Sequence, residues 1–199
     1  MYSFLKELAT IRSGRLFRGK IEPDPNGAYR VIQIGDIDLA QKLSYGKLTR
    51  IDLPDIKPSQ FVKKGDVLFI SRGQRKQAVA LTEEMNNVIT TSQIFVLRPR
   101  EQLVPEFLAW YLNQGPAQRY LEEHSSGTNV SLINMESFGK LQIRTPDLET
   151  QRKIVRIYEL SLRESELLKK IMEKRGALIE RSLLGVIATE ARRHGEGER

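Results

Sequence analysis

The C-terminal part of the chain carries apolar residues at helical spacing and contains no proline after Pro146. Asp147 can cap a helix that starts here, and Glu149 places an acid near the positive end of its dipole. The pattern predicts one helix over residues 147–191, which at ~1.5 Å per residue is about 60 Å long. A compact body of this size does not need so long a helix, so we expect it to pack against another chain. The apolar residues expected to face that partner are Ile157, Leu160, Leu167, Leu168, Ile171, Leu178 and Ile179.

Shorter apolar and alternating runs precede this helix and predict strands. Val67–Ile70 is a continuous apolar run typical of a buried strand, and Leu141 and Ile143 alternate with polar residues. Further strands are predicted over 29–38, 43–53, 78–81 and 88–97, and a helix over 105–112 that can continue to Glu123. The fold class is therefore α+β: a mostly β body over residues 1–146 with a few short helices, then the long helix over 147–191. Residues 192–199 form a polar tail that we expect to be disordered.

Charge narrows the range of partners. The chain of 199 residues has 32 basic and 25 acidic residues, a net charge of +7 that favours a polyanionic partner such as nucleic acid. It has no cysteine, which excludes disulfides and cysteine metal sites. No apolar run approaches the ~18 residues of a membrane-spanning helix, and the first residues lack a signal-peptide core. We expect a cytoplasmic protein.

A first basic loop, punctuated by glycines, could follow a phosphate backbone. Neutralising phosphates supplies most of the sequence-independent affinity for DNA. The loop lacks the spacing of a nucleotide-binding P-loop. A solvated surface loop would explain the same residues equally well. The candidate DNA-binding residues here are Arg12, Arg15, Arg18 and Lys20.

A second loop, Ser71–Gln77, directly follows the predicted buried strand and is better suited to reading bases. Arginine can donate two hydrogen bonds to guanine, and glutamine can pair with adenine, in the major groove. Here too an exposed loop without a ligand remains open. The candidate residues are Arg72, Gln74, Arg75, Lys76 and Gln77.

A third loop, Ser125–Asn129, offers hydroxyl and amide groups, of which Thr128 and Asn129 are candidate DNA contacts. An ordinary turn would explain this loop as well. The two histidines, His124 and His194, lie far apart and form no metal-ligand spacing.

Two other functions compete with DNA recognition. A small metal-dependent nuclease would need clustered acids and a lysine, which Asp24 and the run Asp55-Ile56-Lys57 match superficially. Asp55, however, lies between two prolines, where a turn is expected rather than a strand. A protein-interaction module with an incidental basic surface is the third alternative.

Several segments, in order, resemble the DNA-specificity subunits of type I restriction–modification systems. Phe61–Arg72 resembles the family's run of lysine, glycine and aspartate, an apolar stretch and Ser-Arg. Residues 93–99 and 107–112 resemble its following strand and helix, and Ser126-Gly127 with Leu132 the loop that comes next. Pro146–Ile154 fits the pattern Pro-x-Leu-x-x-Gln-x-x-Ile, the most specific match, with Thr145 replacing the first of the usual two prolines. The resemblance covers nearly all of residues 1–190.

The resemblance implies a non-enzymatic target-recognition domain followed by a spacer helix, which in a full subunit occur twice. Each such domain reads one half of a split target in double-stranded DNA. The implied partners are an adenine-N6 methyltransferase subunit, which would bind S-adenosylmethionine itself, and a restriction subunit. This chain would need no cofactor or metal of its own. With one domain and one helix, it is expected to form a homodimer through the helix, as a coiled coil with polar contacts at Glu164 and Arg175.

Overall fold

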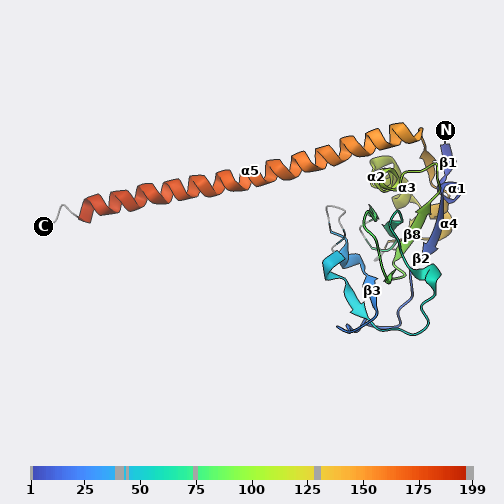
Figure 1. Cartoon of the computed structure of the whole chain (residues 1–199). Coiled ribbons are helices and arrows are strands. Elements are labelled where there is room, and N and C mark those ends of the chain that lie inside the picture. Colours follow the sequence, from blue (N-terminus) through green and yellow to red (C-terminus); the bar gives the residue numbers. More distant parts are fainter. Residues whose placement is uncertain (1, 39–42, 44, 74–75, 128–130, 196–199) are drawn as a thin grey trace. The chain divides into compact units, whose positions relative to one another are not determined.

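The computed structural model describes residues 2–38, 43, 45–73, 76–127 and 131–195, and the side chains of the last helix as far as residue 185 (Figure 1). The chain divides into two compact units, Met1–Val155 and Arg156–Arg199. The first unit, called the body below, contains all the strands and the short helices. The second is the continuation of one long helix.

A four-stranded antiparallel sheet lies at the centre of the body. Its order is β2 (Ala9–Ser13), β8 (Ile94–Pro99), β5 (Val67–Ile70) and β6 (Ala78–Ala80). Val67 and Phe69 of β5 belong to one hydrophobic cluster, while Leu68 and Ile70 belong to another. Both faces of the sheet are therefore covered, which explains why β5 reads as an unbroken apolar run.

Short helices cover one face of this sheet: α2 (Pro105–Leu112), α3 (Gly115–Glu123) and α4 (Met135–Gly139). Phe138 of α4 is fully buried and stacks on Phe69, with ring centroids 4.4 Å apart. Phe107 of α2 is also buried in this cluster. The contacts of Phe138 with Phe69 and Phe95 join α4 to the sheet.

A second sheet contributes to the opposite side. It has three strands in the order β4 (Thr49–Ile51), β3 (Tyr29–Ile32) and β7 (Val88–Thr90), and β3 and β7 run parallel. Ile32 and Val88 pack with Leu68 and Ile70 of the first sheet. Three short 3₁₀ helices lie at Ile34–Asp36, Tyr45–Lys47 and Pro58–Gln60.

The N-terminal segment closes the body against the strand before the long helix. β1 (Tyr2–Phe4) pairs antiparallel with β11 (Gln142–Arg144), and α1 (Leu5–Leu8) leads into β2. A further small pair consists of β9 (Ser125–Ser126) and β10 (Leu132–Ile133).

The long helix α5 (Leu148–Gly195) begins inside the body. Its first turn is capped by Asp147, which accepts hydrogen bonds from the amide and hydroxyl of Thr150. Gln151 is fully buried, accepts a hydrogen bond from the amide of Val104 and donates to the carbonyls of Gln102 and Pro146. The glutamine of the Pro-x-Leu-x-x-Gln-x-x-Ile pattern therefore fixes the helix start to the N-terminus of α2.

The structure confirms the predicted fold class and the buried strand Val67–Ile70, and it corrects several boundaries. The strand predicted over 88–97 is two strands in different sheets, separated by a turn at 91–93. The strand expected over 29–38 ends at Ile32, and that over 43–53 is reduced to Thr49–Ile51. The helix expected over 105–123 is two helices, α2 and α3. α4 was not predicted at all.

The end of the long helix also differs from the prediction. α5 continues to Gly195, so four residues assigned to the polar tail are helical, and 196–199 lie outside the described residues. Within the described residues no helix is long and apolar enough to cross a membrane.

Candidate nucleic-acid interface

The register of the four-stranded sheet brings distant loops to one end of it. Ser13 pairs with Phe95, Ile70 with Ile94, and Phe69 with Ala78. The loop after β2, the loop between β5 and β6, and the turn before β8 therefore all leave the sheet at the same end. We call this end the polar edge; its described residues are 13–20, 71–73, 76–77 and 91–93, together with the segments 125–127 and 131–133 that pair with it.

The turn Thr91–Gln93 holds the first two loops together. On one side, Ser13 donates its hydroxyl to the carbonyl of Ser92 (3.1 Å), and the amide of Ser92 donates to the carbonyl of Arg15 (2.8 Å). On the other side, the amide and hydroxyl of Ser71 both donate to the carbonyl of Gln93, each at 2.9 Å. A single turn thus sets the position of both basic loops.

Gly14 is required where the first loop meets this turn. A Cβ at this position would lie 2.2 Å from the carbonyl oxygen of Thr91 and 2.5 Å from that of Thr90. Those atoms are backbone and cannot rotate away, so no side chain fits here. Gly14, one of the glycines that punctuate this loop in the sequence, is therefore a point of close approach between two backbone segments.

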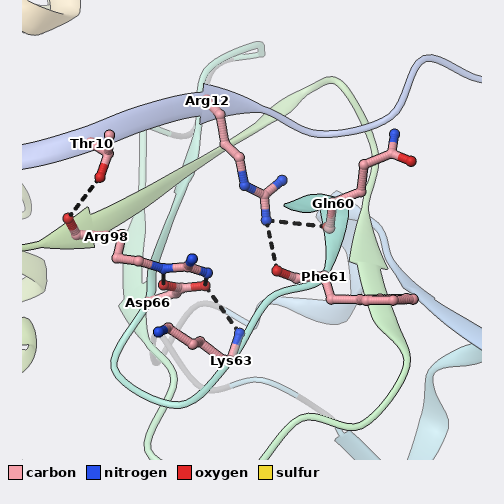
Figure 2. A network of polar contacts seen from close by, with 7 residues as sticks. All are labelled: Thr10, Arg12, Gln60, Phe61, Lys63, Asp66 and Arg98. Atoms are coloured by element: carbon pink, nitrogen blue, oxygen red, sulfur yellow. Dashed lines mark hydrogen bonds and ion pairs between the residues drawn. The ribbon is translucent and has the colours of Figure 1, made fainter. Parts of the chain in front are cut away.

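Arg12 belongs to a network inside the body, drawn in Figure 2. One terminal nitrogen of its guanidinium donates to the carbonyls of Gln60 (3.2 Å) and Phe61 (3.1 Å). Burial lowers the pKa of Arg12 from its ordinary value, and the nearby Asp66 carboxylate acts in the opposite direction. Its contact with DNA stays a prediction, and part of its guanidinium already binds the backbone.

Asp66 is the buried acid of that network. Its carboxylate accepts two hydrogen bonds from Arg98, at 2.7 and 2.9 Å, and one from the amide of Lys63 at 3.0 Å. The hydrogen bonds with Asp66 raise the pKa of Arg98. This pair gives the Gly-Asp step of the sequence pattern a structural role: the aspartate directly precedes β5 and binds Arg98 of β8.

The remaining residues of the first loop are more accessible. Arg15 is half-buried and its guanidinium lies 3.5 Å from the side-chain oxygen of Gln60. Arg18 and Lys20 are exposed, as an approaching phosphate backbone requires.

Among its described residues, the second loop contains one exposed and one buried cation. Arg72 is exposed, and Gln77 is half-buried. Lys76 is only 5% exposed, and its ammonium donates to the carbonyls of Ser71 (3.1 Å) and Ser131 (2.9 Å). Burial lowers the pKa of Lys76. In this conformation Lys76 offers a duplex almost no surface. The candidates Gln74, Arg75, Thr128 and Asn129 lie outside the described residues.

The second and third loops, treated separately in the sequence, are neighbours. Arg72 pairs with Leu132 in an antiparallel bridge, and the amide of Gly73 donates to the carbonyl of Ser131 at 2.9 Å. The segment 131–133 therefore lies beside the second loop, and β9 (Ser125–Ser126) pairs in turn with that segment.

Gln93 is a candidate that sequence reasoning missed, because it was placed inside a strand. Its side chain is exposed at the middle of the polar edge, and its backbone is anchored by Ser71. The polar run Thr90-Thr91-Ser92-Gln93, which interrupts the alternation of apolar residues, was the signal that could have revealed the turn.

The residues named for a nuclease are engaged in turns. Asp24 accepts a hydrogen bond from the amide of Asn26 at 2.8 Å, and Asp55 has a positive φ of 57°. Among the described residues, no three His, Cys, Asp or Glu side chains form a group that could hold a metal ion.

Comparison with known proteins relates the chain to the specificity subunits of type I restriction systems. A family model for the type I restriction modification DNA specificity domain matches residues 1–174. The chain is 35% identical over 132 residues to the HindI specificity subunit of a type I restriction enzyme from Haemophilus influenzae, covering 63% of this chain and 28% of that protein.

Solved structures agree at the level of the fold. A structure from a study of complex assembly in the type I R-M system has a TM-score of 0.67 at 21% identity, covering 91% of this chain and 43% of that one. The HsdS subunit from Thermoanaerobacter tengcongensis has a TM-score of 0.58 at 22% identity, covering 83% and 37%. The S subunit from M. genitalium has a TM-score of 0.56 at 17% identity, covering 80% and 38%. The chain thus spans less than half the length of each of these relatives.

Proposed function

The chain belongs to the type I restriction modification DNA specificity domain family, and from this premise we propose that it is a DNA-recognition subunit without catalytic activity. It reads one half of a bipartite target in double-stranded DNA and docks an adenine-N6 methyltransferase subunit. The methyltransferase, rather than this chain, binds S-adenosylmethionine. A restriction subunit is a further candidate partner.

The observation that carries this proposal is the polar edge. Arg72 and Gln93 are exposed on segments whose backbones are held by hydrogen bonds to neighbouring segments, and Arg18 and Lys20 are exposed on the adjoining loop. An arginine and a glutamine can each make two hydrogen bonds to a purine in the major groove, and the outer cations can neutralise phosphates. Side chains that can bind base edges and side chains that can bind phosphates therefore lie together at one end of the four-stranded sheet.

The experiment is selection of bound duplexes from a random pool by the whole chain, alone and with an adenine-N6 methyltransferase subunit of a type I system. We expect enrichment of one short sequence, occurring twice if two copies bind. Arg72→Ala should cost about 1–3 kcal/mol of specific binding and relax the preference at one base pair.

The matched control is Arg100→Ala, because Arg100 is also exposed but follows β8, at the opposite end of the sheet from the polar edge. Its removal should leave the selected sequence unchanged. Absence of any enriched sequence with either preparation would overturn the proposal. If the chain bound no DNA at any salt concentration, a protein-interaction module would be favoured.

We further propose that α5 forms a homodimer through its apolar stripe. Ile171 and Leu178 are 60% and 64% exposed, and no apolar side chain between Ile157 and Leu184 is buried. A second copy presents an identical stripe, as a two-fold symmetric helix pair requires. The dimer would carry two polar edges and read a symmetric, interrupted target. Light scattering of the whole chain should give twice the monomer mass.

A further inference from the structure

Lys76 lies where residues 71–73 of the second loop bind residues 131–133, which follow the third loop. We call these two paired segments the joint. Its ammonium donates hydrogen bonds to the carbonyls of Ser71 and Ser131. Each of these carbonyls also accepts a hydrogen bond from a backbone amide. The amide of Ile133 donates to Ser71 (3.1 Å), and the amide of Gly73 donates to Ser131 (2.9 Å). One ammonium therefore binds both acceptor oxygens of the backbone joint between the two loops.

That joint determines where Arg72 lies. Arg72 sits between Ser71 and Gly73 and pairs with Leu132 across the joint. Gly73 has a φ of +105°, a conformation that side chains rarely adopt, so the turn after Arg72 has a specific shape. A shift of 131–133 against 71–73 would displace the Arg72 backbone directly.

The backbone of Lys76 is fixed as well. The side-chain amide of Gln118 in α3 donates to the Lys76 carbonyl at 2.8 Å, and the amide of Ile70 in β5 donates to the carbonyl of Gln77 at 2.9 Å. The side chain thus extends from an anchored residue to the joint. A buried cation is costly unless it is hydrogen-bonded, and here two backbone carbonyls accept hydrogen bonds from the ammonium.

We propose that Lys76 is a positioning residue for DNA recognition: it fixes the joint between the second and third loops and so holds Arg72 where it meets a base, without touching DNA itself. The inference rests on the proposed function, in which the polar edge reads DNA. In this proposal the buried Lys76 holds the loop in position, whereas its exposed neighbour Arg72 contacts the base.

The first measurement is amide hydrogen exchange of the whole chain carrying Lys76→Met, which keeps an apolar stem and removes the donors. We expect the amides of Gly73 and Ile133 to exchange at least about tenfold faster. The amide of Ser92, bonded to Arg15 on the same edge but away from Lys76, serves as the internal control. Unchanged exchange at Gly73 and Ile133 would overturn the proposal whether or not the chain binds DNA.

The second measurement is affinity for the duplex selected by the wild-type chain, as a function of salt. A lost phosphate contact lowers the slope of log affinity against log salt by about one, whereas a lost positioning residue leaves the slope unchanged. We expect Lys76→Met to bind about tenfold more weakly with the wild-type slope. A reduced slope would make Lys76 a phosphate contact and overturn the proposal.

Lys76→Arg separates the two roles without removing the charge. A DNA-contacting lysine tolerates arginine, since the cation remains. A lysine enclosed between two carbonyls does not, because the guanidinium is larger and planar. We expect Lys76→Arg to speed exchange at Gly73 and Ile133 and to weaken specific binding at least threefold. Wild-type affinity in this variant would contradict the proposal, even if Lys76→Met does not fold. Failure of the wild-type chain to select any duplex would instead count against the proposed function.

Discussion

The body and the long helix use apolar residues in opposite ways. In the body, Phe69, Phe107 and Phe138 are at most 1% exposed, and they are buried between the short helices and the four-stranded sheet. In α5 beyond Val155, Leu167, Ile171 and Leu178 are 50–64% exposed. The sequence shows a regular pattern of apolar residues in both the body and the helix. The pattern identifies an apolar surface, but it does not tell whether the same chain buries that surface.

Polar groups show the same contrast. In the body, the buried side chains of Asp66, Lys76 and Gln151 each bind backbone groups or a second side chain and define local geometry. In the helix, Glu166 and Lys170 form an exposed pair one turn apart at 3.0 Å. Exposed pairs of this kind contribute only a few tenths of a kcal/mol. The geometry of the body is therefore set by its own buried groups, whereas the apolar stripe of the helix is left exposed for the partner that we propose.

The largest effect is expected from Phe138→Ala. The side chain is fully buried and contacts the rings of Phe69 and Phe95, with centroids 4.4 and 5.5 Å away. Truncating a buried phenylalanine costs about 3–5 kcal/mol in the free energy of unfolding. Urea unfolding followed by fluorescence of Trp110, which lies in the body, measures it. Leu168→Ala on the exposed helix is the control and should leave the body's midpoint unchanged. A loss below about 1 kcal/mol for Phe138→Ala would contradict the assigned core.

The second effect concerns association rather than folding. Ile171→Asp combined with Leu178→Asp places two charges in the proposed helix pair, so light scattering should give the monomer mass. Thermal unfolding of the body should not change, because neither side chain belongs to its core. Leu162→Asp with Ala177→Asp adds the same charge about 80° or more around the helix from every residue of the stripe and should stay dimeric. An unchanged mass for the first variant would refute pairing through this stripe.

The sequence predicted those parts of the fold that depend on local pattern. Val67–Ile70 was read correctly because four successive apolar residues suit a strand covered on both faces. The helix start at Asp147 was read correctly because capping is a local effect. The segment 88–97 was misread because its β-branched residues favour one strand, whereas tertiary pairing divides it between two sheets.

The sequence named candidate residues in three separate loops, and the structure brings the described parts of these loops to one end of the sheet. Residue type alone assigned Arg72 and Lys76 the same role, since both are basic and share a loop. Their environments differ because Ser131, 55 residues further along the chain, supplies a carbonyl that only the folded joint brings to Lys76. Gln93 was missed for a related reason: the turn that exposes it exists only because β7 and β8 join different sheets.

The smallest effect is expected where the body starts the helix. Hydrogen bonds from the amide and hydroxyl of Thr150 hold the pKa of Asp147 below its ordinary value of 3.8. A carboxylate with a lowered pKa stabilises the folded state above its unfolded pKa, and this contribution is lost as the pH falls through its folded pKa. The Thr150 amide should therefore lose protection against hydrogen exchange as the pH is lowered from 5 toward 3 in steps of about 0.5. Protection is measured at each pH relative to the base-catalysed rate at that pH. In Asp147→Asn the cap keeps an acceptor oxygen but cannot titrate, so its Thr150 protection should not vary over that window. An equal loss of protection in both proteins would show that acid acts elsewhere in the body. A loss confined to the wild type would show that the start of the helix depends on its Asp147 cap.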